Sequence, residues 1–234
     1  MDNKKVTKLG ILAGMGPRST TPFLELVLDE CTRQYGAVLD EEFPHIVIYS
    51  LPTPFHPQKP LDHYGMIQSL EVGVSCLVKA DCAVMAMPCN TAHLFYPQIT
   101  KMTPNPFLNM ITETVAAMPE QPGTVGLLAT RSTVDSGLYE AALKAKGKVV
   151  VIDEELQTRV DNLIWQVKQK GVCEDVVCLW EEIEEMLLCI GVTEIVGGCT
   201  DLFFCRERSV LPYYDSAQLL ARRFVEEYVS LNAK

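Results

Sequence analysis

Short apolar segments alternate along the chain with amphipathic ones, and this alternation is typical of strand–helix–strand units with parallel sheets. After the first apolar segment, Pro22 suits the first turn of a helix and Gly36 suits its end. The helical spacing between them is carried by Leu24, Val27, Leu28 and Cys31. The predicted strands cover residues 10–13, 45–50, 82–87, 107–111, 124–128, 148–152 and 193–196. We therefore expect an α/β fold.

Prolines and glycines mark the loops of this fold. Residues 51–60, LPTPFHPQKP, contain four prolines directly after the second predicted strand, where open α/β sheets place ligand-binding loops. Residues 104–106 and 119–123 interrupt the middle of the chain and indicate a boundary between two halves. A long helical stretch over residues 154–190, broken around Gly171, belongs to the second half.

The two halves carry similar motifs. KLGILAGMGPRST, which contains Gly10, resembles TVGLLATRSTVDS, which contains Gly126. ADCAVMAMPCNTAH, which contains Cys89, resembles GVTEIVGGCTDL, which contains Cys199. The paired residues are 116 and 110 positions apart, so we expect one half-domain to be used twice, each with a mostly parallel sheet flanked by helices. The predicted half-domains are residues 1–105 with 212–234, and residues 106–211.

Composition narrows the classes of function. The chain has 234 residues and a formal net charge of −10, which argues against nucleic acid or an anionic membrane as partner, because both need clustered lysine and arginine. No apolar run approaches the roughly 18 residues of a membrane span, and the first apolar stretch is too short for a signal peptide. Nine cysteines cannot all pair internally. We therefore expect a cytoplasmic protein with reduced thiols that acts on a small molecule.

Two of the cysteines stand at the end of a predicted strand. Cys89, in MPCNTAH, opens a helix whose dipole and free N–H groups would lower the pKa of its thiol. Asn90 and Thr91 offer hydrogen-bond donors at the same place. Cys199, in GGCTD, repeats the arrangement with Thr200, and the two glycines let the backbone approach a ligand closely. We interpret the other seven cysteines as core or incidental residues.

Other chemistries fit these motifs less well. A dinucleotide-binding loop in the first motif would need a third glycine where the chain has Ser19. A cysteine hydrolase would need G-x-C-x-G, but Asp201 occupies the place of the last glycine. No C-x-x-C pair supports a zinc site built from Cys89, His93 and the second cysteine, so we expect no metal. Nor does their spacing require Cys89 and His93 to touch as a nucleophile pair.

Two thiols that face each other across a cleft suit one reaction well. A thiolate on one side removes the Cα proton of an amino acid, and a thiol on the other side delivers a proton to the opposite face, which inverts the centre. A single base would return the proton to the side it left. Because charge develops on the substrate carboxylate, donors from Asn90, Thr91 and Thr200 would lie where that charge grows.

The motifs GILAGMGP, MPCNTAH, GLLATRSTVDSGLYE and GGCTDL together resemble the cofactor-independent aspartate/glutamate racemase superfamily, and most of all its aspartate racemase branch. This resemblance implies an active site in the cleft between two half-domains, no pyridoxal phosphate or other cofactor, and a homodimer. It implies that Cys89 and Cys199 are the catalytic acid and base. The matching substrate-binding positions are Met15, Asn90, Thr91 and Thr200.

Two parts of the site differ from the pattern of the superfamily. Related racemases bind the substrate through a lysine near the start of a second-half helix, and the nearest cation here is Arg159. The first-half loop that supplies an arginine in some aspartate racemases corresponds to residues 51–60, which contain none. Its polar candidates here are His56, Gln58 and Lys59. We take Gln58 as the predicted contact. Asp201 and His93 are expected to orient the two cysteines without touching the substrate.

We therefore predict an isomerase, an amino-acid racemase that interconverts the L and D forms of aspartate or glutamate. One alternative is a related isomerase or decarboxylase that acts on a small dicarboxylate. Another is a protein without catalytic activity that binds a small ligand or senses thiol oxidation. Exchange of the Cα hydrogen with deuterated water, followed together with chirality, separates these alternatives.

Overall fold

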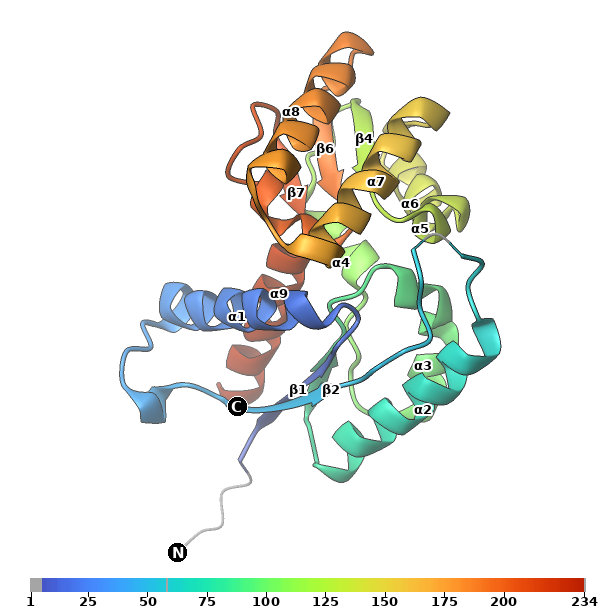
Figure 1. Ribbon diagram of the computed structural model, residues 1–234. Coiled ribbons are helices and arrows are strands. Elements are labelled where there is room, and N and C mark those ends of the chain that lie inside the picture. Colours follow the sequence, from blue (N-terminus) through green and yellow to red (C-terminus); the bar gives the residue numbers. More distant parts are fainter. Residues whose placement is uncertain (1–5, 58, 234) are drawn as a thin grey trace, which may run out of the picture.

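The structure is a computed structural model that describes residues 6–57 and 59–233. Figure 1 shows two stacked lobes, each built around its own sheet. The lower lobe has a parallel sheet in the order β2-β1-β3, with strands β1 (Lys8–Ala13), β2 (His45–Ser50) and β3 (Val84–Ala86). The upper lobe has a parallel sheet in the order β5-β4-β6-β7, with strands β4 (Thr124–Leu128), β5 (Val149–Val151), β6 (Glu194–Gly197) and β7 (Tyr213–Asp215).

The two sheets repeat one arrangement. In each sheet the first strand of the lobe lies between the next two, so that β2-β1-β3 corresponds to β5-β4-β6. The central strands are buried on both faces, as expected for parallel sheets that are covered by helices. This confirms the predicted α/β class and the use of two similar sheets.

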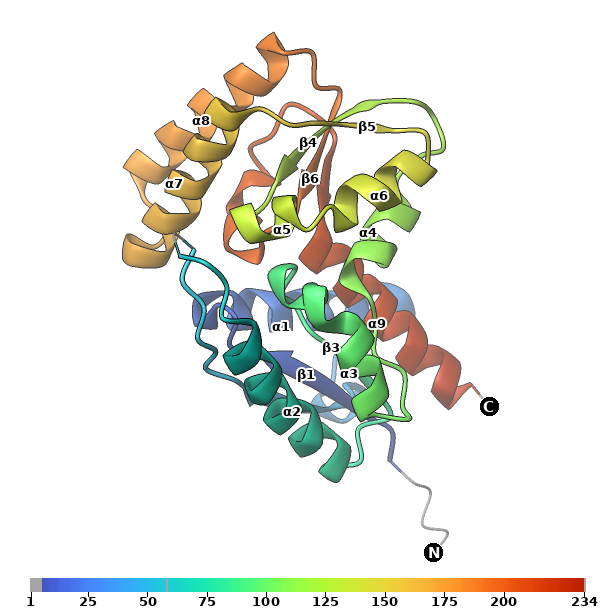
Figure 2. The ribbon, with the colours of Figure 1, turned by 90° about the vertical axis from the view of Figure 1, so that its right-hand side faces the viewer.

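Helices cover both faces of each sheet, as Figure 2 shows from the side. The lower sheet packs on one face against α1 (Thr20–Tyr35) and α9 (Ser216–Asn232), and on the other against α2 (His63–Lys79) and α3 (Tyr96–Met102). The upper sheet packs against α7 (Glu154–Lys170) and α8 (Glu174–Cys189) on one face, and against α4 (Met110–Ala117) and α6 (Leu138–Ala145) on the other. The short helix α5 (Arg131–Asp135) follows β4. Among the described residues, no helix is long and apolar enough to span a bilayer.

Local sequence fixes several of these boundaries. Helix α1 ends at Gly36, which adopts φ 78°, a left-handed conformation that glycine tolerates best. Asp62 caps α2 by accepting the N–H of Gly65 at 2.9 Å, and Asp153 caps α7 in the same way. Gly171, at φ 75°, separates α7 from α8, which confirms the predicted break.

Two parts of the chain differ from the predicted elements. The strand predicted at residues 107–111 is wrong: Phe107 makes an isolated bridge to Met85, and helix α4 begins at Met110. The reason is Asn109, whose side-chain oxygen accepts the N–H groups of two following residues and starts the helix. Strand β7 was also not among the strands predicted from the sequence.

The chain crosses between the lobes near its C-terminus. Strand β7 joins the upper sheet, whereas α9, which follows it directly, packs against α1 in the lower lobe. The division into residues 1–105 with 212–234 and residues 106–211 stays a proposal about separable units. Its second boundary lies next to this crossing.

Candidate active site

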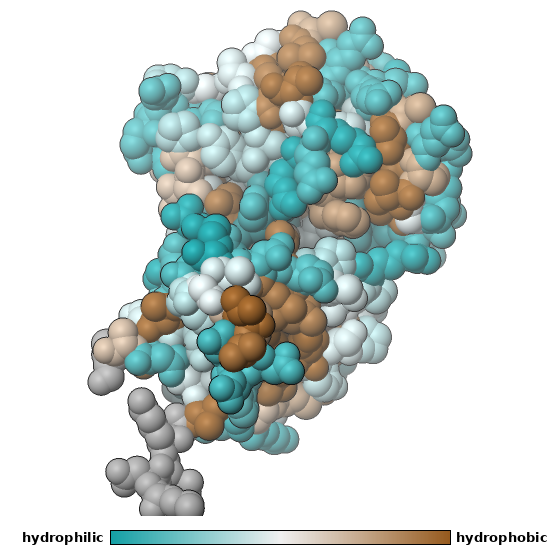
Figure 3. All heavy atoms as spheres, turned by 90° about the vertical axis from the view of Figure 1, so that its left-hand side faces the viewer, coloured by the Kyte–Doolittle hydropathy of each residue, from teal (hydrophilic) through white to brown (hydrophobic). Residues whose placement is uncertain are grey.

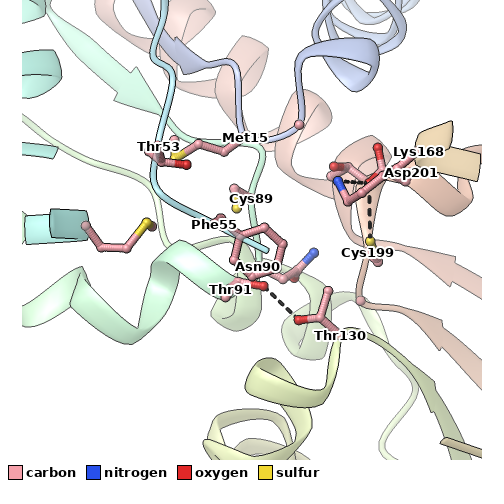
Figure 4. Close-up of a pocket in the computed structure, with 14 residues that line it drawn as sticks. Met15, Thr53, Phe55, Cys89, Asn90, Thr91, Thr130, Lys168, Cys199 and Asp201 are labelled. Carbon is pink, nitrogen blue, oxygen red and sulfur yellow. Dashed lines mark hydrogen bonds and ion pairs between the residues drawn. The ribbon is translucent and has the colours of Figure 1, made fainter. Parts of the chain in front are cut away.

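A cavity between the lobes is lined by both copies of the repeated cysteine motif. Its empty volume, counted together with the space that opens to solvent, is about 410 Å³. Figure 4 shows Cys89 on the side of the lower lobe and Cys199 beside Lys168 and Asp201 on the side of the upper lobe. The lining residues are Met15, Gly16, Thr53, Phe55, Met66, Cys89, Asn90, Thr91, Thr130, Lys168, Gly198, Cys199, Thr200 and Asp201.

The two cysteines occupy equivalent places in the two lobes. Cys89 follows β3 and precedes a 3₁₀ helix at Thr91–Phe95. Cys199 follows β6 and precedes a 3₁₀ helix at Thr200–Cys205. Since the carboxyl ends of both sheets face the same space between the lobes, the two motifs contribute to one cavity.

Burial has a larger effect on the pKa of the Cys89 thiol than the helix start has. Desolvation raises its pKa to about 11, although the backbone N–H groups of Ala92 and Thr91 and the ammonium of Lys168 oppose the increase. The prediction that the helix start lowers this pKa is therefore wrong. The thiol of Cys89 is protonated at neutral pH.

Cys199 also keeps its proton, and the balance of nearby charges differs from that at Cys89. Burial again raises its pKa, and the carboxylate of Asp201 adds to the effect, while Lys168 opposes it. The thiol donates toward Asp201 Oδ2 over an Sγ–Oδ2 distance of 4.0 Å. Lys168 and Asp201 therefore act on both thiols, but Asp201 has the larger effect on the pKa of Cys199 and Lys168 has the larger effect on the pKa of Cys89.

Lys168 and Asp201 form an ion pair at the edge of the cavity. Lys168 Nζ lies 2.6 Å from Asp201 Oδ2, and the side chain of Asp201 is only 5% exposed. Burial opposes the charge of Lys168, but Asp201 and the two nearby thiols outweigh it and raise its pKa. Gly16 leaves room for the pair, because a Cβ at that position would lie 3.0 Å from Lys168 Nζ.

The geometry of the cavity corrects the prediction that Arg159 is the substrate-binding cation. Arg159 does not line the cavity, because it points to the surface and bonds to Glu182 at 3.0 Å and to Glu155 at 3.2 Å. The cation at the cavity is Lys168, on the same helix. Gln58 lies outside the residues that the structure describes, so its predicted contact remains untested.

Hydroxyl groups connect the two lobes around the thiols. The hydroxyl of Thr91 lies 2.8 Å from that of Thr130 and 3.0 Å from that of Thr133, both from the upper lobe. On the other side, Thr200 Oγ1 donates to Ser19 Oγ of the lower lobe at 3.1 Å. Both predicted threonines therefore line the cavity while they hold the lobes together.

The amide of Asn90 is held in one orientation. Its oxygen accepts the hydroxyl of Tyr139 at 2.7 Å, and its nitrogen donates to Ser216 Oγ at 3.0 Å. An amide nitrogen carries two N–H groups, so one remains to donate to a ligand. Met15, a further predicted contact, also lines the cavity.

His93 forms a hydrogen bond to the backbone of the turn that carries Cys89. Its Nε2 accepts the N–H of Met110 at 3.0 Å, so the proton is on Nδ1, which donates to the carbonyl of Cys89 at 2.8 Å. Burial lowers its pKa to about 4, which keeps the ring neutral. Since both ring nitrogens are occupied, His93 is not arranged as a base for the thiol or as a zinc ligand.

The proline-rich loop after β2 contributes to the cavity, as its place after a parallel strand predicted, but Thr53 and Phe55 were not among the predicted contacts. Thr53 and Phe55 line the cavity, and the ring of Phe55 lies 5.9 Å from Lys168 Nζ. The ring of His56 lies 5.3 Å from that of Trp165 on α7. The loop of the lower lobe therefore reaches α7 of the upper lobe, as Figure 2 shows.

Comparison with known proteins agrees with this architecture. Residues 12–224 match the family described as Asp/Glu/Hydantoin racemase, and the chain belongs to this family. It is 36% identical over 224 residues to the broad specificity amino-acid racemase RacX of Bacillus subtilis (strain 168), covering 95% of this chain and 98% of that protein. The family and this relative make the chain a racemase and hence an isomerase.

Solved structures share the fold. Picrophilus torridus aspartate racemase superimposes with a TM-score of 0.78 and 25% identity, covering 94% of each chain. Glutamate racemase from Francisella tularensis, in complex with D-glutamate, superimposes with a TM-score of 0.69 and 14% identity, covering 97% of this chain and 82% of that one. Both resemble this chain in having two lobes around parallel sheets.

Proposed function

We propose that this racemase interconverts the L and D forms of an acidic amino acid, aspartate or glutamate, with Cys89 and Cys199 as acid and base. The observation that carries the proposal is the placement of the two thiols: they occupy equivalent turns of two similar lobes and line one cavity. The proposed site needs no cofactor, because the two thiols account for both proton transfers.

The proton transfers are balanced between the thiols. The thiolate of one cysteine takes the Cα proton and becomes a thiol, while the carbanion takes a proton from the opposite thiol, which becomes a thiolate. The configuration is then inverted, and the negative charge has moved from one sulfur to the other. In the reverse direction the two cysteines exchange roles.

The remaining lining groups stabilise charge in this scheme. Lys168, the free N–H of Asn90 and the hydroxyl of Thr91 face the space where the substrate carboxylate gains charge. Burial keeps both thiols protonated at neutral pH, so the proposed reaction requires that substrate binding favours a thiolate. The ammonium group of the substrate supplies a positive charge near both sulfurs, which favours the thiolate.

The other proposals concern assembly and location. We infer a homodimer, as the resemblance implies, and its support is the exposure of Val38 (75%) and Leu39 (59%). Figure 3 shows separate apolar patches among hydrophilic ones, including one on the lower lobe. Light scattering measures the oligomeric state, and a monomer at every protein concentration would contradict the homodimer. The predicted cytoplasmic location likewise stays a proposal.

The racemase proposal is tested in deuterated water with aspartate and glutamate as substrates. We expect the purified protein to form the opposite enantiomer carrying deuterium at Cα. Cys89→Ala and Cys199→Ala should each reduce racemisation by roughly 10²-fold to 10⁴-fold, the usual contribution of an acid or base. Cys178→Ala, at an exposed thiol of α8, is the matched control and should retain activity.

Two results would contradict the scheme. Full activity in either active-site variant would exclude two-base transfer. A covalent substrate adduct on Cys89, detected by mass spectrometry, would favour an isomerase that uses this thiol as a nucleophile.

A further inference from the structure

A second cavity opens outward from the one that holds the cysteines. Its empty volume is about 650 Å³. The two cavities share Met15, Gly16, Thr53, Phe55, Lys168 and Asp201. The outer one adds Gly14, Pro17 and Arg18. An amino acid whose Cα lies between the thiols can therefore extend its side chain past these shared residues toward Arg18.

The charges of the two cavities match different parts of a substrate. In the inner cavity, Lys168 and Asp201 neutralise each other at 2.6 Å, and both thiols are protonated. This neutral pair suits the α-ammonium and α-carboxylate of an amino acid, which also sum to zero. The outer cavity contains the same pair and Arg18, so its described residues carry one additional positive charge.

Arg18 differs from the other arginines of the chain. It forms no hydrogen bond or ion pair with another described residue, although acidic residues outnumber basic ones 30 to 20. The other seven arginines each contact a carboxylate or a carbonyl oxygen; they are Arg33, Arg131, Arg159, Arg206, Arg208, Arg222 and Arg223. An unpaired guanidinium at the opening of a cavity is available to an anionic ligand.

The backbone beside Arg18 is fixed to both lobes. Arg18 lies in a 3₁₀ turn at Pro17–Ser19. The hydroxyl of Ser19 donates to the carbonyl of Gly16 at 2.8 Å and accepts the hydroxyl of Thr200 at 3.1 Å. The starting point of the arginine side chain is thus set relative to Cys199, although the guanidinium itself is exposed.

We propose that Arg18 is a specificity-determining residue whose guanidinium binds the side-chain carboxylate of an acidic amino acid. This inference rests on the proposed racemase function. Arginine suits the role because its planar group bonds a carboxylate through two parallel N–H groups, which lysine cannot do.

The test compares substrates of nearly equal shape and different charge. Racemisation of glutamate and of glutamine is measured for the wild type, Arg18→Gln and Arg18→Lys. We expect Arg18→Gln to raise KM for glutamate by about 10-fold to 100-fold, the effect of losing a charged hydrogen bond, with little change in kcat. KM for glutamine should change much less, and Arg18→Lys should restore part of the glutamate affinity. Arg159→Gln, at an arginine away from the cavity, is the control.

The possible outcomes distinguish a failure of the Arg18 proposal from a failure of the proposed racemase function. Equal changes in KM for glutamate and glutamine would show a structural role and overturn the inference. Wild-type preference for glutamine or another neutral amino acid would also overturn it while the racemase function stands. Failure to racemise any amino acid would instead remove the proposed function itself.

Discussion

The turns that carry Cys89 and Cys199 have the same position in the two lobes but different surroundings. The Cys89 turn is held by a neutral histidine, His93, which bonds its carbonyl group. The Cys199 turn carries a carboxylate, Asp201, that approaches the thiol and pairs with Lys168. The two similar sheets therefore account for the equivalent positions of the thiols, while the residues around each turn set the charges beside them.

This difference has a chemical consequence for a reversible racemase. In the proposed scheme, proton removal from one enantiomer uses one thiol as base, and removal from the other enantiomer uses the other thiol. Because Asp201 disfavours the thiolate of Cys199 more directly than that of Cys89, the two directions are expected to respond differently to changes around Asp201.

After the cysteine variants themselves, the largest effect is expected at Lys168, whose charge acts on both thiols. Lys168→Gln removes the cation of the inner cavity and leaves the buried Asp201 carboxylate without its partner. We expect kcat/KM to fall by roughly 10²-fold to 10³-fold, comparable with loss of one charge-stabilising group in other enzymes. Steady-state kinetics of racemisation in both directions measure this decrease in kcat/KM.

Lys170→Gln is the matched control for this change. Lys170 lies near the end of the same helix, but it is exposed and pairs with Asp175 at 2.8 Å. An exposed pair of this kind contributes little to stability, so activity should be close to that of the wild type. Equal losses in both variants would mean that the helix, and not the cavity cation, was disturbed.

The histidine beside Cys89, His93, should make the stability of the protein depend on pH, and the Cys199 turn has no such group. Its pKa in the folded protein is about 4, below the usual value of 6.5. The unfolded chain binds more protons between these values, so stability is complete above pH 6.5 and is lost as pH falls toward 4. The contribution is on the order of 3 kcal/mol.

Urea unfolding at several pH values measures this dependence. The free energy of unfolding of the wild type should fall between pH 6.5 and 4, and His93→Asn should remove much of that slope. His45→Asn changes an exposed histidine and should leave the slope intact. A slope that His93→Asn does not alter would contradict a neutral, buried His93.

The sequence predicted that both cysteines lie at one site, but it did not predict the cation of that site, Lys168. Cys89 and Cys199 were recognisable because each motif is local, a strand end followed by a turn. Lys168 was missed in favour of Arg159, nine positions earlier on α7. Nine residues are two and a half helical turns, which places the two side chains on opposite faces and about 13.5 Å apart along the helix axis.

A signal for Lys168 was present in the helix pattern. Val160 and Ile164 are buried at a spacing of four, and Lys168 continues that spacing on the same face. A lysine in such a register either covers a core or enters a cavity. The choice between them depends on packing against the other lobe, which the sequence pattern does not contain. The thiol pKa values were mispredicted for the same reason, since they depend on burial between the lobes.

The smallest expected effect directly tests the difference between the thiols. Asp201→Asn removes the negative charge beside Cys199 and frees the positive charge of Lys168, and both changes lower the pKa of the thiol. Alkylation by iodoacetamide, followed for each cysteine by peptide mass spectrometry, should therefore occur at a lower pH. We expect a shift of about one pH unit or more for Cys199 and a smaller one for Cys89.

Asp175→Asn provides the control for this titration, because Asp175 pairs with Lys170 outside the cavity. It should leave both alkylation profiles unchanged. Equal shifts at Cys89 and Cys199 in the Asp201→Asn protein would show that the carboxylate acts on the cavity as a whole. In that case the two thiols would be electrostatically alike, and the different rates expected for the two directions would need a cause other than Asp201.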